Sequence, residues 1–177
     1  MKRILFLFAA IFSLALTAQA QVIGWSVKPG VYNKIEPYWN DMYLVKKTGK
    51  TGIIKGDGSV VVPAVASRIT GFYDGLAIAL QTDGGNERIL GILSDDGSYA
   101  QVDGTFYAIP YQEFFSEGLL TITTPRGQTG YMNGMGHVVK TFNASIVSPF
   151  SEGYAVVGEG KDYKLIEGHL QNPVLKN

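Results

Sequence analysis

The stretch Phe115-Ser-Glu-Gly118 decides the fold class, because the chain carries it in three versions. Phe72-Tyr-Asp-Gly75 precedes it, Phe150-Ser-Glu-Gly153 follows it, and each version leads into a short apolar run. One pattern that recurs along a chain is typical of repeat proteins, in which similar units pack side by side. The sequence therefore predicts an array of units rather than one globule built around a single catalytic centre.

A second pattern, Gly-apolar-apolar-x-x-x-Gly, recurs at intervals of 39 residues. Its glycine pairs are Gly52 and Gly58, Gly91 and Gly97, and Gly130 and Gly136. Hairpin turns place residues at positive φ, where a Cβ atom is costly, and we expect the second glycine of each pair to have this role. The Phe of each Phe-x-x-Gly corner is interpreted as a large apolar wedge between neighbouring sheets.

Short apolar runs at residues 43–45, 76–80, 119–123 and 154–157 are rich in β-branched, aliphatic or aromatic residues and are bounded by Gly, Asp or Asn, which is typical of strands. No stretch after residue 20 sustains a helical period. The predicted fold is all-β, with four tandem antiparallel three-stranded β-meander repeats stacked as a solenoid or a propeller-like array. The predicted organisation is a signal peptide at 1–20, a single domain at 21–177, a half-unit cap at 22–38, and repeats at 39–71, 72–114, 115–149 and 150–177, with an insertion at 102–105.

The first twenty residues have the pattern of a secretory signal peptide. Lys2 and Arg3 precede an uncharged apolar stretch at residues 4–16, and Ala18-Gln-Ala20 supplies small residues for cleavage after Ala20. The stretch is shorter than the roughly 20 residues that a membrane-spanning helix needs. We expect a periplasmic or secreted protein that is not inserted in the membrane after cleavage.

Composition excludes several classes of function. The whole chain has 15 basic and 15 acidic residues and no basic cluster, so nothing predicts binding to nucleic acid or to an anionic membrane surface. There is no cysteine, which excludes disulfide bonds, a lipobox anchor, thiolate metal sites and a cysteine nucleophile. Stability has to come from burial of apolar side chains.

The Phe-Ser-Glu-Gly corner, followed by Gly130-Tyr-Met-Asn and by motifs such as Val60-Val-Val-Pro63, resembles the WG-repeat family of bacterial proteins over about residues 30–173. Thr51, Leu90 and Thr129 stand where that family has the Trp of its name. The resemblance implies a repeat-built, non-catalytic protein, and it implies no particular partner.

Residues that could carry chemistry are spread over equivalent positions of different units. His137 and His169 each follow the turn glycine of their unit, and Glu117 and Glu152 each precede a corner glycine. Equivalent positions in adjacent three-stranded units are expected about 14 Å apart, too far for a shared metal ion or a catalytic carboxylate pair. Asp57, Asp95 and Asp96 are interpreted as turn residues. We therefore predict no catalytic residue, metal or cofactor.

The aromatic residues give the remaining indication of binding. They exceed what the corners require, and Phe106, Tyr107 and Tyr111 beside the insertion form the candidate binding surface. The predicted function is an exported, non-catalytic scaffold that binds an unknown protein, peptide or glycan in the cell envelope. The alternative is a hydrolase of cell-envelope polysaccharide that uses Asp or Glu carboxylates.

Overall fold

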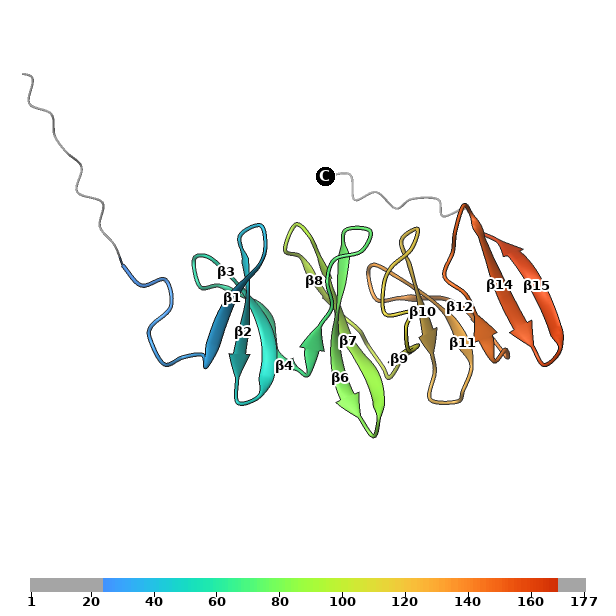
Figure 1. Ribbon diagram of the computed structural model, residues 1–177, viewed down its shortest axis with the longest axis horizontal. Helices are drawn as coiled ribbons and strands as arrows, with labels where there is room; N and C mark the ends of the chain where they lie inside the picture. Colours follow the sequence, from blue (N-terminus) through green and yellow to red (C-terminus); the bar gives the residue numbers. More distant parts are fainter. Residues whose placement is uncertain (1–23, 169–177) are drawn as a thin grey trace, which may run out of the picture.

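The computed structural model of the chain describes residues 24–168. Every regular element within this range is a β-strand, and every strand pair is antiparallel, so the predicted all-β antiparallel class is confirmed (Figure 1). The predicted signal peptide with cleavage after Ala20 lies outside the described residues, as do His169 and the last residues of the fourth predicted unit.

The strands are arranged in four consecutive groups, which we call layers 1 to 4. Layer 1 consists of β1 (Lys34–Trp39), β2 (Met42–Lys47), β3 (Lys50–Lys55) and β4 (Val60–Ala66). Layer 2 consists of β5 (Arg68–Ile69), β6 (Leu76–Asp83), β7 (Asn86–Ser94) and β8 (Tyr99–Gln101). Layer 3 consists of β9 (Tyr107–Ala108), β10 (Leu119–Thr123), β11 (Thr129–Asn133) and β12 (Val138–Phe142), and layer 4 of β13 (Ile146–Val147), β14 (Tyr154–Glu159) and β15 (Asp162–Glu167).

The pairing of the strands differs from the predicted three-stranded meanders. The segments expected to be corners contain the two-residue strands β5, β9 and β13, which pair with β6, β10 and β14. In addition, β9 pairs with β7 through Tyr107 and Arg88, so layers 2 and 3 share one eight-stranded sheet. Two-residue strands are too short to show an alternating pattern, which is why the sequence did not reveal them.

The three Phe-x-x-Gly corners fold into the same tight turn. Backbone N–H groups and carbonyls are exchanged between Tyr73 and Leu76 at 2.9 and 3.0 Å, and the pairs Ser116 with Leu119 and Ser151 with Tyr154 do the same. Two successive residues with positive φ lie between the partners, for example Asp74 at 54° and Gly75 at 73°. This is a type I′ turn, whose twist matches the twist of the strands it joins.

The two glycines of the second pattern have different structural roles. Gly58, Gly97 and Gly136 have φ of 88°, 86° and 80°, as predicted for turn glycines. The first glycine of each pair instead has a close neighbour on the paired strand, which is backbone at Gly52 and Gly130 and the Tyr99 ring at Gly91. A Cβ atom on Gly130 would lie 2.1 Å from the carbonyl oxygen of Lys140 on the paired strand β12.

Three apolar cores lie between the four layers, which follow one another in a row (Figure 1). Strand β6 contributes to two of them, because its side chains alternate between its faces. Ala77 and Ala79 pack into the core shared with layer 1, whereas Ile78 and Leu80 pack into the core shared with layer 3. Strand β10 repeats this arrangement, so both faces of the inner layers are buried.

The corner phenylalanines pack between layers, as the wedge interpretation expects. Phe115 is 2% exposed and lies in the core between layers 2 and 3. The Phe150 ring packs 4.9 Å from Tyr131 of layer 3, and the Phe72 ring packs 5.3 Å from Tyr38 of layer 1.

We predict that Phe115→Ala lowers the free energy of unfolding by about 3–5 kcal/mol, because it removes a buried ring and leaves a cavity. Denaturant titration of both proteins measures the change. Tyr111→Ala is the matched control, since Tyr111 is 94% exposed and its truncation should cost less than about 0.5 kcal/mol. Equal stability of the two variants would contradict the wedge role.

Tyrosine hydroxyls join successive layers. The Tyr38 hydroxyl of layer 1 donates to the carbonyl of Thr70, and the Tyr131 hydroxyl of layer 3 donates to the carbonyl of Ser148 at 2.8 Å. Thr70 and Ser148 each precede a corner Phe by two residues, and each accepts a backbone N–H on its side-chain oxygen. Burial raises the pKa of Tyr38 from 10.0 to about 12 and also raises the pKa of Tyr131.

The raised tyrosine pKa values predict loss of stability in alkali. The folded state holds the phenol proton of Tyr38 more tightly than the unfolded chain, so its contribution is complete below pH 10 and is lost as the pH rises through about 12. Urea midpoints measured between these values should fall with pH. We expect the urea midpoint of Tyr38→Phe to fall less steeply with pH. An identical slope in this variant would contradict the contribution of the Tyr38 phenol to the loss of stability.

Candidate functional site

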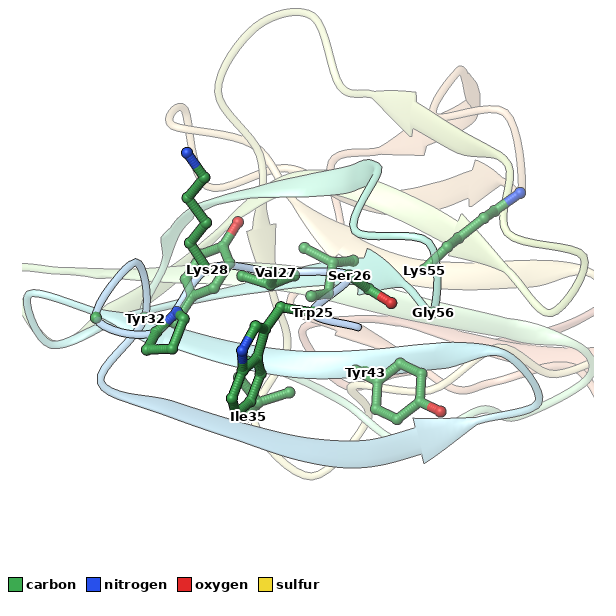
Figure 2. A pocket seen from close by; sticks show the side chains of 12 residues that line it. Trp25, Ser26, Val27, Lys28, Tyr32, Ile35, Tyr43, Lys55 and Gly56 are labelled. Atoms are coloured by element: carbon green, nitrogen blue, oxygen red, sulfur yellow. The ribbon is translucent and has the colours of Figure 1, made fainter. Parts of the chain in front are cut away.

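A cavity of about 360 Å³ lies at the N-terminal end of the row, between residues 25–32 and the outer face of layer 1 (Figure 2). Its lining residues come from the N-terminal segment and from strands β1, β2 and β3 with the turn that follows. They are Trp25, Ser26, Val27, Lys28, Pro29, Gly30, Tyr32, Ile35, Tyr43, Ile54, Lys55 and Gly56.

The alternation of side chains along β2 explains why Tyr43 faces this cavity. Met42 and Leu44 point into the core shared with layer 2, so Tyr43 between them points to the opposite face, where it lines the cavity. The corresponding residue in layer 2, Ala77, packs against layer 1. The cavity therefore occupies the position that a preceding layer fills elsewhere in the row.

Residues 26–27 cover the turn at Gly58, just as layer 1 covers the corresponding turn at Gly97 in layer 2. A Cβ atom on Gly58 would lie 2.7 Å from the Ser26 carbonyl oxygen, and one on Gly97 would lie 3.1 Å from Cε of Lys55 in layer 1. A single segment of bends and one turn has fewer side chains than a four-stranded layer. It closes over the turn but leaves the space beside Tyr43 unfilled.

The chemistry of the cavity is that of an apolar binding site. Trp25, Tyr32 and Tyr43 supply aromatic rings, and Ile35 and Ile54 supply aliphatic side chains. The Trp25 side chain is 82% exposed, and Figure 2 shows the ammonium groups of Lys28 and Lys55 directed away from its indole. The twelve lining residues include no Asp, Glu or His, so the cavity has no acid and base pair of its own.

The structure separates the residues of the predicted aromatic surface into different environments. Phe106 packs against the core between layers 2 and 3, Tyr107 is half-buried in β9, and Tyr111 is exposed with φ of 65°. The cavity residues were not singled out from the sequence. Tyr32 and Tyr43 belong to the excess of aromatics noted above, but no spacing pattern connects them with Trp25.

The carboxylates that precede the corner glycines bind backbone of the next layer. Asp74 accepts the N–H of Gly118 at 2.6 Å, and Glu117 accepts the N–H of Gly153 at 3.0 and 3.1 Å with its two oxygens. Glu152, the last of the series, is exposed, and the described part of the chain places no hydrogen-bond donor on it. Asp74 and Glu117 thus act as links between layers.

The remaining candidate residues lie in turns. Asp57 accepts the N–H of Ser59 at 2.8 Å and Asp96 accepts that of Ser98 at 2.7 Å, which supports their interpretation as turn residues. These hydrogen bonds to serine lower the pKa of both carboxyl groups. His137 is exposed beside a turn. Residues 24–168 contain no group of three or more His, Asp or Glu side chains arranged to hold a metal ion.

We predict that Glu117→Ala lowers stability by about 1 kcal/mol more than Glu152→Ala does, because it removes the hydrogen bonds to Gly153. The two residues are a matched pair, since both have φ of 52° at the same position of a type I′ turn. Chemical denaturation gives both values. Equal losses would show that the link between layers contributes nothing measurable.

Comparison with known proteins assigns no family to the chain. No family model matches the chain, and no curated protein matches it significantly. Among residues 24–168, no helix is long and apolar enough to cross a membrane.

Proposed function

We propose that this protein is an exported, non-catalytic scaffold of stacked β repeats, of the WG-repeat type, that binds a peptide or protein through the N-terminal cavity. The cavity between residues 25–32 and layer 1 is the observation that carries this proposal. Its volume is within the roughly 300–1,000 Å³ of typical ligand pockets, at the lower end. That size suits one large apolar side chain or two smaller ones.

The repeat part of the proposal is supported by hydrogen bonds that recur in the same places. The three corners share one turn type. In the turns at Gly58, Gly97 and Gly136, the glycine N–H donates to the carbonyl of the residue three positions earlier. Alternating side chains bury both faces of the inner layers. These features fit an open solenoid, in which layers 1 and 4 lie at opposite ends of the row (Figure 1).

The chemistry of the lining favours a peptide over a glycan or a hydrolase substrate. The hydroxyl groups of a sugar need several hydrogen-bonding partners, because buried polar groups without partners are costly. The cavity offers mainly aromatic and aliphatic surface. Hydrolysis of a glycosidic bond needs two carboxyl groups flanking the substrate, and none lines this cavity.

We expect a peptide with a Phe or Leu residue to shift the emission of Trp25 to shorter wavelength, because the bound side chain removes water from the exposed indole. The chain has two tryptophans, so a Trp39→Phe background leaves Trp25 as the single reporter. Tyr43→Ala should then weaken binding about tenfold or more, as loss of a buried aromatic contact does.

Tyr111→Ala is the control for this titration, since it removes an exposed ring outside the cavity lining. A peptide of the same length with Ser in place of the apolar residue controls for backbone binding, and a soluble oligosaccharide tests the glycan. Peptides that leave the Trp25 emission unchanged, or equal weakening by Tyr43→Ala and Tyr111→Ala, would overturn the proposed site.

A further inference from the structure

Charge is distributed unevenly along the row. Residues 24–66, which form layer 1 and the segment that covers it, contain six lysines and three acidic residues, a net charge of +3. Residues 67–168, which form the other three layers, contain six basic and twelve acidic residues, a net charge of −6 with histidine neutral. The end of the row that carries the N-terminal cavity therefore attracts anionic groups, and the rest of the row repels them.

Two of these lysines face each other on the side of layer 1 that carries the cavity. In the register of β2 and β3, Lys47 lies directly opposite Lys50, and we call these two residues the lysine pair. Side chains alternate along a strand, so Lys47 projects from the same side of the sheet as Tyr43, which lines the cavity. Like charges directly opposite each other in a sheet are destabilising. The lysine pair is thus an unfavourable contact that an anion beside it would relieve.

The rest of layer 1 does not neutralise the lysine pair. No acidic residue among residues 24–168 forms an ion pair with Lys47 or Lys50. A second opposed pair, Lys34 and Lys46, projects from the other side of the sheet, and there Glu36 binds Lys34 at 2.6 Å. Glu36 is the one acidic residue in strands β1 to β4, so the side that carries the cavity has lysines without a matching carboxylate in these strands.

The lysine pair lies beside one end of the cavity. Tyr32 lines the cavity, and the next residue, Asn33, donates its N–H to the carbonyl of Lys46 at 2.7 Å. The side-chain oxygen of Asn33 accepts the N–H of Thr48 at 2.9 Å. The hairpin between β2 and β3, which carries the lysine pair, is thereby held next to the Tyr32 end of the cavity.

A third lysine, Lys28, adds to this charge. The N–H of Val31 donates to the Lys28 carbonyl at 3.4 Å, and this turn brings Lys28 back to the end of the cavity that carries the lysine pair. Lys55, the other lysine in the lining, instead interacts electrostatically with Asp57 and Asp96. We call Lys28 and the lysine pair the cationic rim. The ammonium group of Lys28 is directed away from the indole of the cavity (Figure 2), so the rim leaves the apolar lining free.

We propose that the N-terminal cavity takes a peptide that carries acidic residues beside its apolar anchor residue. This inference rests on the proposed function, which places the anchor in the cavity, and it adds carboxylates on the cationic rim. Lys47 lies four residues from Tyr43 along β2, a distance of about 13 Å at about 3.3 Å per residue. An extended peptide advances at the same rate, so its carboxylates lie about three or four residues from the anchor.

A short acidic peptide fits the charge distribution better than an anionic membrane surface does. Salt screens exposed charges beyond about 8 Å, so a peptide of a few residues at the cationic rim meets mainly the positive end of the row. An extended anionic surface also meets the other layers, whose net charge of −6 opposes its approach. The cavity beside the rim has the size of one large apolar side chain, which a peptide supplies.

Titration of three peptides against the Trp39→Phe protein, followed by the emission of Trp25, tests the proposal. One peptide has Phe followed by Asp at the third and fourth positions, one has the two Asp residues at the same distances before Phe, and one has Asn in place of Asp. We expect one Asp peptide to bind about three- to tenfold more tightly than the Asn peptide at low salt, since each exposed ion pair contributes about 1.5- to 5-fold. This advantage should shrink at high ionic strength.

Lys47→Gln should weaken binding of the preferred Asp peptide about two- to fivefold and leave binding of the Asn peptide unchanged. Lys46→Gln is the matched control, because it removes the same charge from the neighbouring position on the other side of the sheet, and it should change neither affinity. Lys47→Gln relieves the repulsion with Lys50, so the variant should be at least as stable as the parent protein, which chemical denaturation verifies.

Equal binding of the Asp and Asn peptides, or equal effects of Lys47→Gln and Lys46→Gln, would overturn the acidic preference and leave the cavity as a peptide site. An unchanged Trp25 emission with all three peptides would overturn the proposed function together with this inference. Co-sedimentation of the protein with phosphatidylglycerol vesicles, without binding of any peptide, would assign the cationic rim to a membrane surface and overturn the acidic peptide.

Discussion

Side chains of a β-strand alternate between the two faces of its sheet, and in this protein both faces of each inner layer have to be buried. Strand β6 shows the consequence, with Ala77 and Ala79 in one core and Ile78 and Leu80 in the next. Each inner layer is therefore held by its neighbours on both sides. The small residues face layer 1 and the large residues face layer 3, which is how two cores of different shape are filled by one strand.

The corner turns and their hydrogen bonds hold neighbouring layers in a fixed relative position. A type I′ turn at each corner sets the position of the following strand, and the carboxylates of Asp74 and Glu117 connect one corner to the N–H of the next. Both residues have positive φ, which is unfavourable for side chains with a Cβ atom. The cost is offset at two of the three corners by a charge-assisted hydrogen bond to the next layer.

The two ends of the row are where burial is incomplete, and the cavity proposed to bind lies at one of them. At the N-terminal end a single segment covers layer 1 and leaves a cavity beside Tyr43. At the C-terminal end the face that carries Val156 and Leu165 has no cover among residues 24–168. Both surfaces are positions at which another layer would pack in the interior, so their apolar character follows from the architecture itself.

The sequence by itself determined the strand class and the turn positions. Residue type and glycine placement are local properties, and they predicted the hairpin at Gly97, the strand at residues 76–80 and the packing role of Phe115. Local properties could not predict β9, because Tyr107 and Ala108 form a strand only where Arg88 and Ile122 come within hydrogen-bonding reach. Only the tertiary structure decided which aromatic residues stay accessible. It placed Phe106 against a core and brought Trp25 and Tyr43 to the lining of one cavity, since exposure depends on what the neighbouring layer covers.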